Sequence, residues 1–277
     1  MWHTNANRLL LRIWKYWRVC RITPFGELQQ PGRITAAAIR LTTQVFLLSC
    51  LWQALYSGTE MSAELTEGQA TSYAVLAVLA KQIRTLDRTA TRDALIQHVQ
   101  EGTILYWFLR PIRPRRYYVI RAIGDQFYGL LWLAAGYCVC LAAGVIIPPS
   151  SAGAALASAV SLCLGQVILY HLLSAIDLLC FWTIVNQSAV RILQFVQNML
   201  SGYFAPLWFF PAWFVTANSF LPFAGTLHIP ISLYVGRIPL SDAFREITVQ
   251  AVWCVFLSLT ARRLWVRAEA HLTIQGG

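Results

Sequence analysis

Charged side chains are scarce in this 277-residue sequence. Asp, Glu, Lys and Arg together make up 12% of it, about half of their share in a typical soluble domain. Hydrophobic residues make up 57%, and the mean hydropathy is +0.53. So little charge cannot cover the water-exposed surface of a soluble protein of this length, whereas long apolar helices can satisfy their own backbone within lipid. The sequence therefore predicts an all-α integral membrane protein.

The motifs of ATPases and hydrolases are absent. A P-loop needs Gly-Lys-Ser/Thr, because its lysine reaches the phosphates from a glycine-rich turn. The only two lysines, Lys15 and Lys81, follow Trp14 and Ala80 instead. H-E-x-x-H and G-x-S-x-G are also missing, and the five histidines are dispersed. We therefore expect a chain that is not an enzyme and holds no cofactor of its own.

The seven cysteines show no metal-binding pattern. They are scattered, mostly within apolar runs, and neither C-x-x-C nor a metal-ligand spacing to histidine is present. Cysteines in such surroundings behave as small apolar side chains. We therefore predict no metal site.

The N-terminal segment, residues 1–33, mixes basic and apolar side chains. Five basic residues alternate with Leu and Trp, so the uncharged core of a signal peptide is absent. This mixture is typical of an amphipathic helix that lies in the membrane interface. We expect such a helix to precede a single membrane domain, residues 34–277. The basic residues are Arg8, Arg12, Lys15, Arg18 and Arg21.

Charge placement and apolar runs predict six membrane spans. The loop at residues 58–68 carries three Glu and no basic residue, whereas residues 81–121 carry nine basic residues against three acids. Basic connections remain on the cytoplasmic side, so these two connections should lie on opposite faces, with both chain ends in the cytoplasm. The predicted spans are residues 34–56, 69–88, 117–147, 152–182, a fifth span after a turn at 186–191, and 242–264.

Prolines interrupt the apolar sequence between the fifth and sixth spans. They leave no continuous stretch of the ~20 residues that a crossing needs, and aromatic side chains crowd the same segment, as in an interfacial belt. We therefore predict two short re-entrant helices at about residues 206–238. A kinked pair of full spans is the alternative, and it would place the C-terminus differently. The prolines are Pro206, Pro211, Pro222, Pro230 and Pro239.

A short helix is predicted within the basic connection, at about residues 91–102. Thr91 is suited to the N-cap, Asp93 lies in the first turn, and Gly102 provides a C-terminal stop. An apolar stripe on this helix can lie in the groove of another protein; an ordinary positive loop is the alternative. The stripe consists of Leu95, Ile96 and Val99, and the contact is also assigned to Arg92, Asp93, Glu101, Gly102 and Arg110.

The fourth predicted span carries three polar side chains, Gln166, His171 and Asp177. An ionisable residue within a membrane helix usually faces a partner or a cavity. These three residues are therefore candidates for translocation or gating. Alternatively, Asp177 has a structural role, either paired with Arg191 or Arg40 or extended to the interface.

Four stretches of sequence resemble one family of transporters. They are E-G-T-I-L-Y-W-F-L-R-P at 101–111, L-S-G-Y-F-A-P-L-W-F-F-P-A-W at 200–213, L-P-F-A at 221–224, and T-I-Q-G-G at 273–277. Over nearly its whole length the chain is similar to permeases of type-2 ATP-binding-cassette (ABC) transporters, in the small-permease subfamily that includes viologen exporters. The resemblance implies six spans, an N-terminal interfacial helix, a cytoplasmic coupling helix between spans two and three, and re-entrant helices between spans five and six.

The resemblance also implies partners and a function. Such a permease pairs with a second permease, identical or a homologous sister, and carries two cytosolic ATPase subunits that bind ATP and Mg. We expect it in the cytoplasmic membrane of a bacterium, in contact with lipids and not with nucleic acid, where it exports an amphiphilic small molecule or drug-like compound. The alternatives are export of a lipid, glycoconjugate or peptide by the same fold, or a membrane scaffold or sensor that transports nothing.

Overall fold

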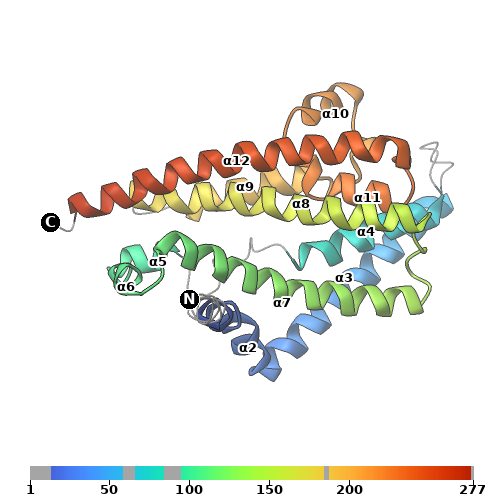
Figure 1. Ribbon diagram of the computed structural model, residues 1–277. Helices are drawn as coiled ribbons and strands as arrows, with labels where there is room; N and C mark the ends of the chain where they lie inside the picture. The colour runs from blue at the N-terminus through green and yellow to red at the C-terminus, as the bar shows by residue number, and fades with distance from the viewer. Residues whose placement is uncertain (1–13, 59–65, 84–94, 184–186, 276–277) are drawn as a thin grey trace, which may run out of the picture.

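The structure is a bundle of helices that run roughly side by side (Figure 1). It is a computed structural model that describes residues 14–58, 66–83, 95–183 and 187–275, and all regular elements in these ranges are helical. The all-α expectation is confirmed for these residues. The bundle consists of α3 (Pro31–Gly58), α4 (Glu67–Lys81), α7 (Pro114–Ala142), α8 (Ala152–Asp177), α9 (Gln187–Leu200) and α12 (Leu240–Gln275).

Three stretches of helix are long and apolar enough to cross a membrane. They are Pro31–Tyr56, Ala152–Phe181 and Leu240–His271, and they coincide with the first, fourth and sixth predicted spans. α7 has 29 residues but carries three Arg and one Asp among its first twelve. α4 and α9 have 15 and 14 residues, fewer than the ~20 that a crossing needs. The chain is thus a membrane protein, and the count of six spans stays a prediction.

The outer surface of the bundle is apolar. Phe46 on α3, Val139 on α7, and Phe244 and Val252 on α12 are all exposed. A soluble monomer rarely exposes so many large apolar side chains, whereas lipid accommodates them. α8 is the central helix, because it packs against α9, α11 and α12 and against the turn η4.

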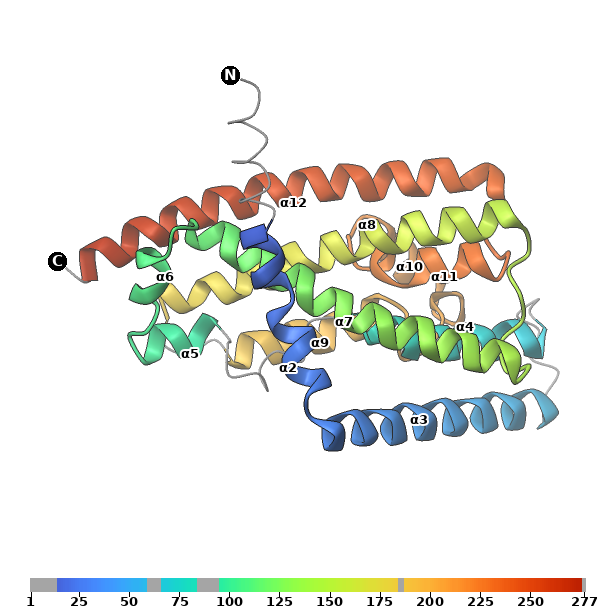
Figure 2. The same ribbon diagram turned by 60° about the horizontal axis from the view of Figure 1, so that its bottom comes forward.

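Two short helices, α5 (Leu95–Gln100) and α6 (Leu105–Leu109), form a hairpin at one end of the bundle, which we call the hairpin end. The C-terminal end of α12 lies at the same end (Figures 1 and 2). The connection between α7 and α8 and the start of α12 lie at the opposite end. The prediction that α12 ends on the side of the basic connection therefore agrees with the arrangement of the helices.

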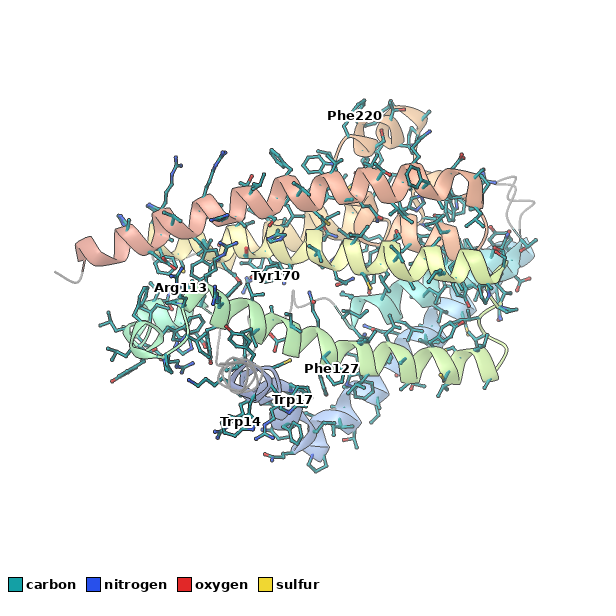
Figure 3. All side chains as sticks on the ribbon, viewed as in Figure 1. Trp14, Trp17, Arg113, Phe127, Tyr170 and Phe220 are labelled. Atoms are coloured by element: carbon teal, nitrogen blue, oxygen red, sulfur yellow. The ribbon has the colours of Figure 1, made fainter. Side chains whose placement is uncertain are left out.

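The described part of the N-terminal segment, from residue 14, lies across α7 (Figure 2). Residues 14–20 are helical, and α2 (Ile22–Leu28) packs against α7. Trp14 and Trp17 are exposed and project away from the bundle (Figure 3), and the Arg18 guanidinium lies 4.6 Å from the centre of the Trp14 ring. Exposed aromatic and basic side chains are those of an interfacial helix, although its position in a membrane stays a prediction.

The proline-rich segment that follows α9 contains only short helices. It consists of η3 (Leu207–Phe209), α10 (Ala212–Ser219), η4 (Ala224–Thr226) and α11 (His228–Tyr234). α10 and α11 have eight and seven residues, too few to cross a bilayer. α10 protrudes from the bundle, whereas α11 packs against α8 (Figure 1).

Several boundaries differ from the sequence-based predictions. The second span, predicted at residues 69–88, is helical from Glu67 and ends at Lys81. The turn expected at residues 186–191 is helical from Gln187, because α9 is amphipathic and buries Val190 and Gln197 in the bundle. α7 ends at Ala142 rather than at 147, because Gly144 adopts a positive φ of 70° that breaks the helix. α12 continues to Gln275, because residues 240–275 contain neither glycine nor proline.

Candidate functional site

The hairpin end is built from the connection that the sequence assigned to a coupling helix. Within the described residues α5 spans Leu95–Gln100, inside the predicted range of 91–102; Thr91, Arg92 and Asp93 lie outside the described residues. The turn between α5 and α6 uses Gly102 with a φ of 69°, a conformation that favours glycine. His98 Nδ1 lies 2.8 Å from Thr103 Oγ1, and the Ile104 amide donates to the His98 carbonyl at 2.9 Å. These bonds join α5 and α6 into one unit.

The apolar stripe of α5 faces the chain itself. Leu95 and Ile96 are only 2% and 7% exposed, and Val99 is half-buried. They pack into a set of side chains from α5, α6, α7, the turn η2 (Leu178–Phe181) and α12, which we call the hairpin cluster. The stripe is therefore not free to lie in the groove of another protein. The cluster contains Leu95, Ile96, Ile104, Trp107, Tyr117, Tyr118, Leu178, Cys180, Phe181, Trp265 and Ala268.

α6 carries the apolar surface that remains exposed on the hairpin. Leu105, Tyr106 and Leu109 point outward, and Leu109 is 79% exposed. The sequence signal was the run L-Y-W-F-L within a basic connection, but only Trp107 of that run is buried. Arg110 follows this surface, with its guanidinium 4.3 Å from the centre of the Tyr117 ring.

Asp177 is linked to the hairpin cluster. The Tyr118 hydroxyl donates to Asp177 Oδ2 at 2.5 Å, which joins the end of α8 to α7. Gln166 is buried, and neither its side-chain oxygen nor its nitrogen has a partner among the described residues. Gln166 lies eleven residues from Asp177, about 16 Å along the helix axis. His171 packs against Tyr170. Around the helix axis, His171 lies well away from both Gln166 and Asp177. The three candidates therefore do not form one site.

A second polar region, absent from the sequence-based candidates, holds the proline-rich segment in place. Gln250 Nε2 on α12 donates to the carbonyl of Gly225 at 2.6 Å and to that of Ser161 at 3.3 Å. Gln197 Nε2 on α9 donates to Thr226 Oγ1 at 2.5 Å. Three helices therefore hold η4, because α8 also contacts it directly.

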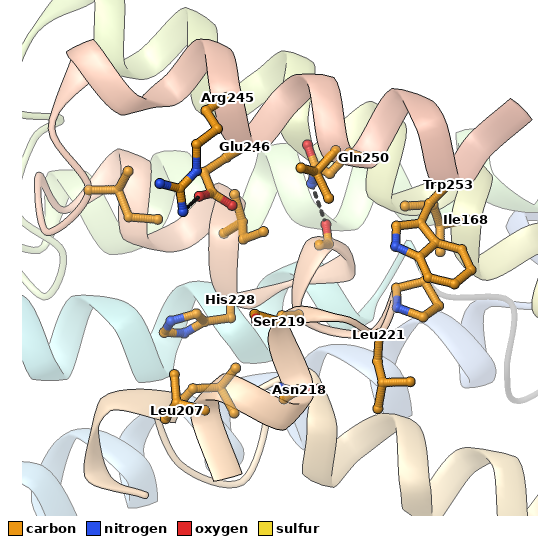
Figure 4. Close-up of a pocket in the computed structure, with 17 residues that line it drawn as sticks. Ile168, Leu207, Asn218, Ser219, Leu221, His228, Arg245, Glu246, Gln250 and Trp253 are labelled. Atoms are coloured by element: carbon orange, nitrogen blue, oxygen red, sulfur yellow. Dashed lines mark hydrogen bonds and ion pairs between the residues drawn. The ribbon is translucent and has the colours of Figure 1, made fainter. Parts of the chain in front are cut away.

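A cavity of about 260 Å³ lies between this segment and the first turns of α12 (Figure 4). It is lined by residues of α8, α10, α11 and α12, among them Asn218, His228, Glu246 and Gln250. The sequence offered little signal for it, since Gln250 is a single amide within an apolar run and its partners Gly225 and Ser161 lie 25 and 89 residues away. In the described part of the chain, no group of three His, Cys, Asp or Glu residues is placed to bind a metal.

Comparison with known proteins assigns the family. The model of the family described as "ABC-2 family transporter protein" matches residues 40–276, which include most of α3 and all the helices that follow. No curated protein and no solved structure matches the chain. Permeases of this family are the transmembrane component of a transporter rather than its ATPase, and they work with ATPase subunits. The match agrees with the apolar helical bundle, and the chain belongs to the ABC-2 family of transporter proteins.

Proposed function

We propose that this chain is the permease subunit of an ATP-driven exporter, with the exposed apolar surface of α6 as the contact for a cytosolic ATPase. The observation that carries this proposal is the position of Leu105, Tyr106 and Leu109 on a hairpin whose other side is packed into the bundle. Two ATPase subunits bind ATP and Mg, and the permease contributes the path for the cargo. The cargo is an amphiphilic small molecule or drug-like compound.

The hairpin cluster provides a route from α6 to the spans. Trp107 of α6 packs edge-on against Tyr117 of α7, with ring centres 4.8 Å apart. Tyr118 packs against Trp265 of α12 at 5.5 Å and donates to Asp177 at the end of α8. A force on α6 therefore acts on α7, α8 and α12 together, because close-packed side chains transmit displacement. Asp177 takes part in this proposal as a gating residue.

Membrane orientation follows from charge. The hairpin end carries the basic residues of 95–121 together with Arg262, Arg263 and Arg267 of α12. We propose that this end faces the cytoplasm of a bacterial cell, since the positive-inside rule predicts the cytoplasmic side for a basic end. Both chain ends then lie on the cytoplasmic side, and the proline-rich segment re-enters from the outer side.

A second permease subunit, identical or a homologous sister, completes the proposed transporter. α9 supports this pairing, because its buried side chains include the polar Gln197, whereas the apolar Ile192 and Phe195 are exposed. Contact with an apolar partner would bury these exposed side chains and stabilise the 14-residue helix α9. Export of a lipid, glycoconjugate or peptide, or a non-transporting scaffold or sensor, remains the alternative reading.

Replacing Leu109 with aspartate tests the ATPase contact. A buried leucine contributes about 1.5–3 kcal/mol, and a carboxylate without a partner in the same groove adds a penalty. The variant should fold, because Leu109 is exposed, but it should retain at most about a tenth of the ATPase that co-purifies with the wild type.

The control is Leu109→Met, which keeps an apolar side chain of similar size and should retain the ATPase. Permease expression is matched in all samples, and cargo-stimulated ATP hydrolysis is measured in parallel. Unchanged ATPase retention by the aspartate variant would refute the docking surface. If the wild-type permease retains the ATPase but cargo does not stimulate ATP hydrolysis, the result would instead support a scaffold.

A further inference from the structure

Arg40 places a positive charge in the middle part of α3. The stretch Pro31–Tyr56 is long and apolar enough to cross a membrane, and Arg40 lies nine residues from its start, about 14 Å along the helix axis. That depth is close to the midplane of a hydrocarbon core about 30 Å thick. A charged side chain at this depth is costly unless it faces a partner, a cavity or a substrate path. We therefore expect Arg40 to interact with a specific group.

Lys81 of α4 lies at nearly the same depth. A Cβ at Gly136 of α7 would lie 2.5 Å from Leu79 Cδ2 and 3.6 Å from Leu41 Cδ2, so α3, α4 and α7 meet at this level. Arg40 precedes Leu41 by one residue and Lys81 follows Leu79 by two, so both lie within about 3 Å of this level along their helix axes. Two positive charges are thus placed at one depth.

Both side chains point away from α7. Thr42 of α3 lines the groove between α3 and α7, and Leu79 of α4 reaches α7 at Gly136. Arg40 and Lys81 are each two residues away from these positions, which is about 200° around a helix. Arg40 is exposed, and Lys81 is half-buried. The two charges therefore lie on the same face of the molecule, opposite α7.

Aromatic rings connect Lys81 to the exposed surface of α9. The Lys81 ammonium lies 4.4 Å from the centre of the Tyr203 ring. Tyr203 packs against Phe204, with ring centres 5.8 Å apart. Phe204 in turn packs against Phe195 of α9, with ring centres 6.4 Å apart. Phe195 belongs to the exposed surface proposed for contact with the second permease. The two cations therefore lie beside the proposed space between the two permeases.

No carboxylate of the described chain neutralises these two charges. Neither Arg40 nor Lys81 forms an ion pair with a described residue. Asp177, which the sequence offered as a partner for Arg40, accepts a hydrogen bond from Tyr118 at the hairpin end instead. The negative charge that balances this face must therefore come from a bound molecule.

We infer that Arg40 and Lys81 bind the acidic group of an amphiphilic anion. A guanidinium can bind a carboxylate, sulfonate or phosphate through two parallel hydrogen bonds, and an ammonium adds a further charged donor. Leu47 and Leu51 follow Arg40 on the same exposed side of α3 and offer contact to the apolar part of the ligand. A cationic or neutral amphiphile would leave both charges unpaired in an apolar layer. The role of this anion as cargo rests on the proposed function, whereas its binding requires no ATPase.

The probe is 8-anilinonaphthalene-1-sulfonate, titrated by fluorescence into the full-length permease in phosphatidylcholine nanodiscs, with empty nanodiscs as the reference. N-phenyl-1-naphthylamine is the same molecule without the sulfonate and reports apolar binding alone. Arg40→Gln and Lys81→Gln should each weaken sulfonate binding about tenfold, because each removes a charged hydrogen-bond donor to the anion. Binding of the neutral probe should not change. Unchanged sulfonate binding in both variants, or equal losses for the two probes, would overturn the inference.

Matched variants locate the site. Arg33→Gln removes the same charge from the same helix, but Arg33 lies near the start of α3 and pairs with Glu27 at 3.0 Å, so sulfonate binding should remain unchanged. Arg40→Lys keeps the charge and should retain most of the binding. An equal loss in Arg33→Gln and Arg40→Gln would show that the probe responds to general surface charge, which refutes the site.

An acid of the second permease is the competing partner for Arg40. In that case Arg40→Gln would separate the permease pair in size-exclusion chromatography and leave sulfonate binding intact, which would also overturn the inference. If Arg40 binds the anion, the variant should keep the elution volume of the wild type, because Arg40 is exposed and its loss removes no packed side chain.

The natural anion has two sources, a free amphiphile or the phosphate of an anionic lipid. Phosphatidylglycerol in the nanodisc should displace the sulfonate, beyond the loss seen with empty nanodiscs, only if the lipid phosphate occupies the site. Probe binding without transport of any anionic amphiphile by the intact transporter would support the site and refute the cargo role. Transport of such amphiphiles by Arg40→Gln at the wild-type rate would refute the site and leave the exporter function intact.

Discussion

Replacing Leu95 with aspartate should leave almost no folded permease in the membrane. Leu95 is fully enclosed in the hairpin cluster, between α5, α7, η2 and α12. The change removes about 1.5–3 kcal/mol of apolar burial and buries a carboxylate among the apolar and aromatic side chains of the cluster, at a further cost of several kcal/mol. The sum is comparable with the whole stability of a typical protein, about 5–15 kcal/mol.

The matched control is Leu109→Asp, the same change on the exposed surface of the same hairpin. Monodisperse permease after detergent extraction, measured by size-exclusion chromatography, should be close to wild type for Leu109→Asp and nearly absent for Leu95→Asp. A well-folded Leu95→Asp variant that has lost only its ATPase would show that the α5 stripe is free and that the ATPase binds there instead.

Gly165→Ala should destabilise the permease, although alanine normally strengthens a helix. A Cβ at Gly165 would lie 2.6 Å from the Gly225 carbonyl oxygen and 2.9 Å from Thr226 Cα. Both are backbone atoms of η4, which Gln197 and Gln250 hold in place, so they cannot move aside as a flexible side chain would. Overpacking of this kind costs about 1–3 kcal/mol.

Gly26→Ala is the same change in α2, where a Cβ would meet nothing within 4 Å. It should raise stability by about 0.5–1 kcal/mol, because alanine loses less conformational freedom in a helix. Thermal unfolding of both variants in the same detergent should therefore show shifts of opposite sign. A shift of the same sign for both would mean that η4 does not lie against Gly165 in the folded protein.

The long spans could be predicted because their signal is local. A run of about 25 apolar residues marks a crossing whatever it packs against. The predicted starts of the first, fourth and sixth spans lie within three residues of the observed starts of the helices, and that of the fourth coincides. α4 and α9 are too short for that signal. Their ends depend on tertiary contacts, such as the burial of Gln197 against η4.

The hairpin cluster and the cavity show the point at which sequence periodicity is no longer informative. The spacing of Leu95, Ile96 and Val99 indicated a buried face of a short helix, but not whether this chain or a partner buries it. For the cavity even that signal was missing, because Asn218 and Gln250 bind backbone carbonyls 18 and 25 residues away, at the end of α9 and in η4. Carbonyls are common to all residues, so no residue type at those positions marks the contact.

α12 connects the two ends of the molecule as one rigid element. Its 36 residues extend about 54 Å, well beyond the ~30 Å hydrocarbon core of a bilayer. Trp265 is buried in the hairpin cluster, and Gln250, about 22 Å away along the same helix, holds the Gly225 carbonyl beside the cavity. Without glycine or proline a helix has no ready point at which to kink. When α12 tilts at Trp265, it therefore moves as a rigid rod and Gln250 moves with it. The hairpin end cannot move far without a change in the shape of the cavity.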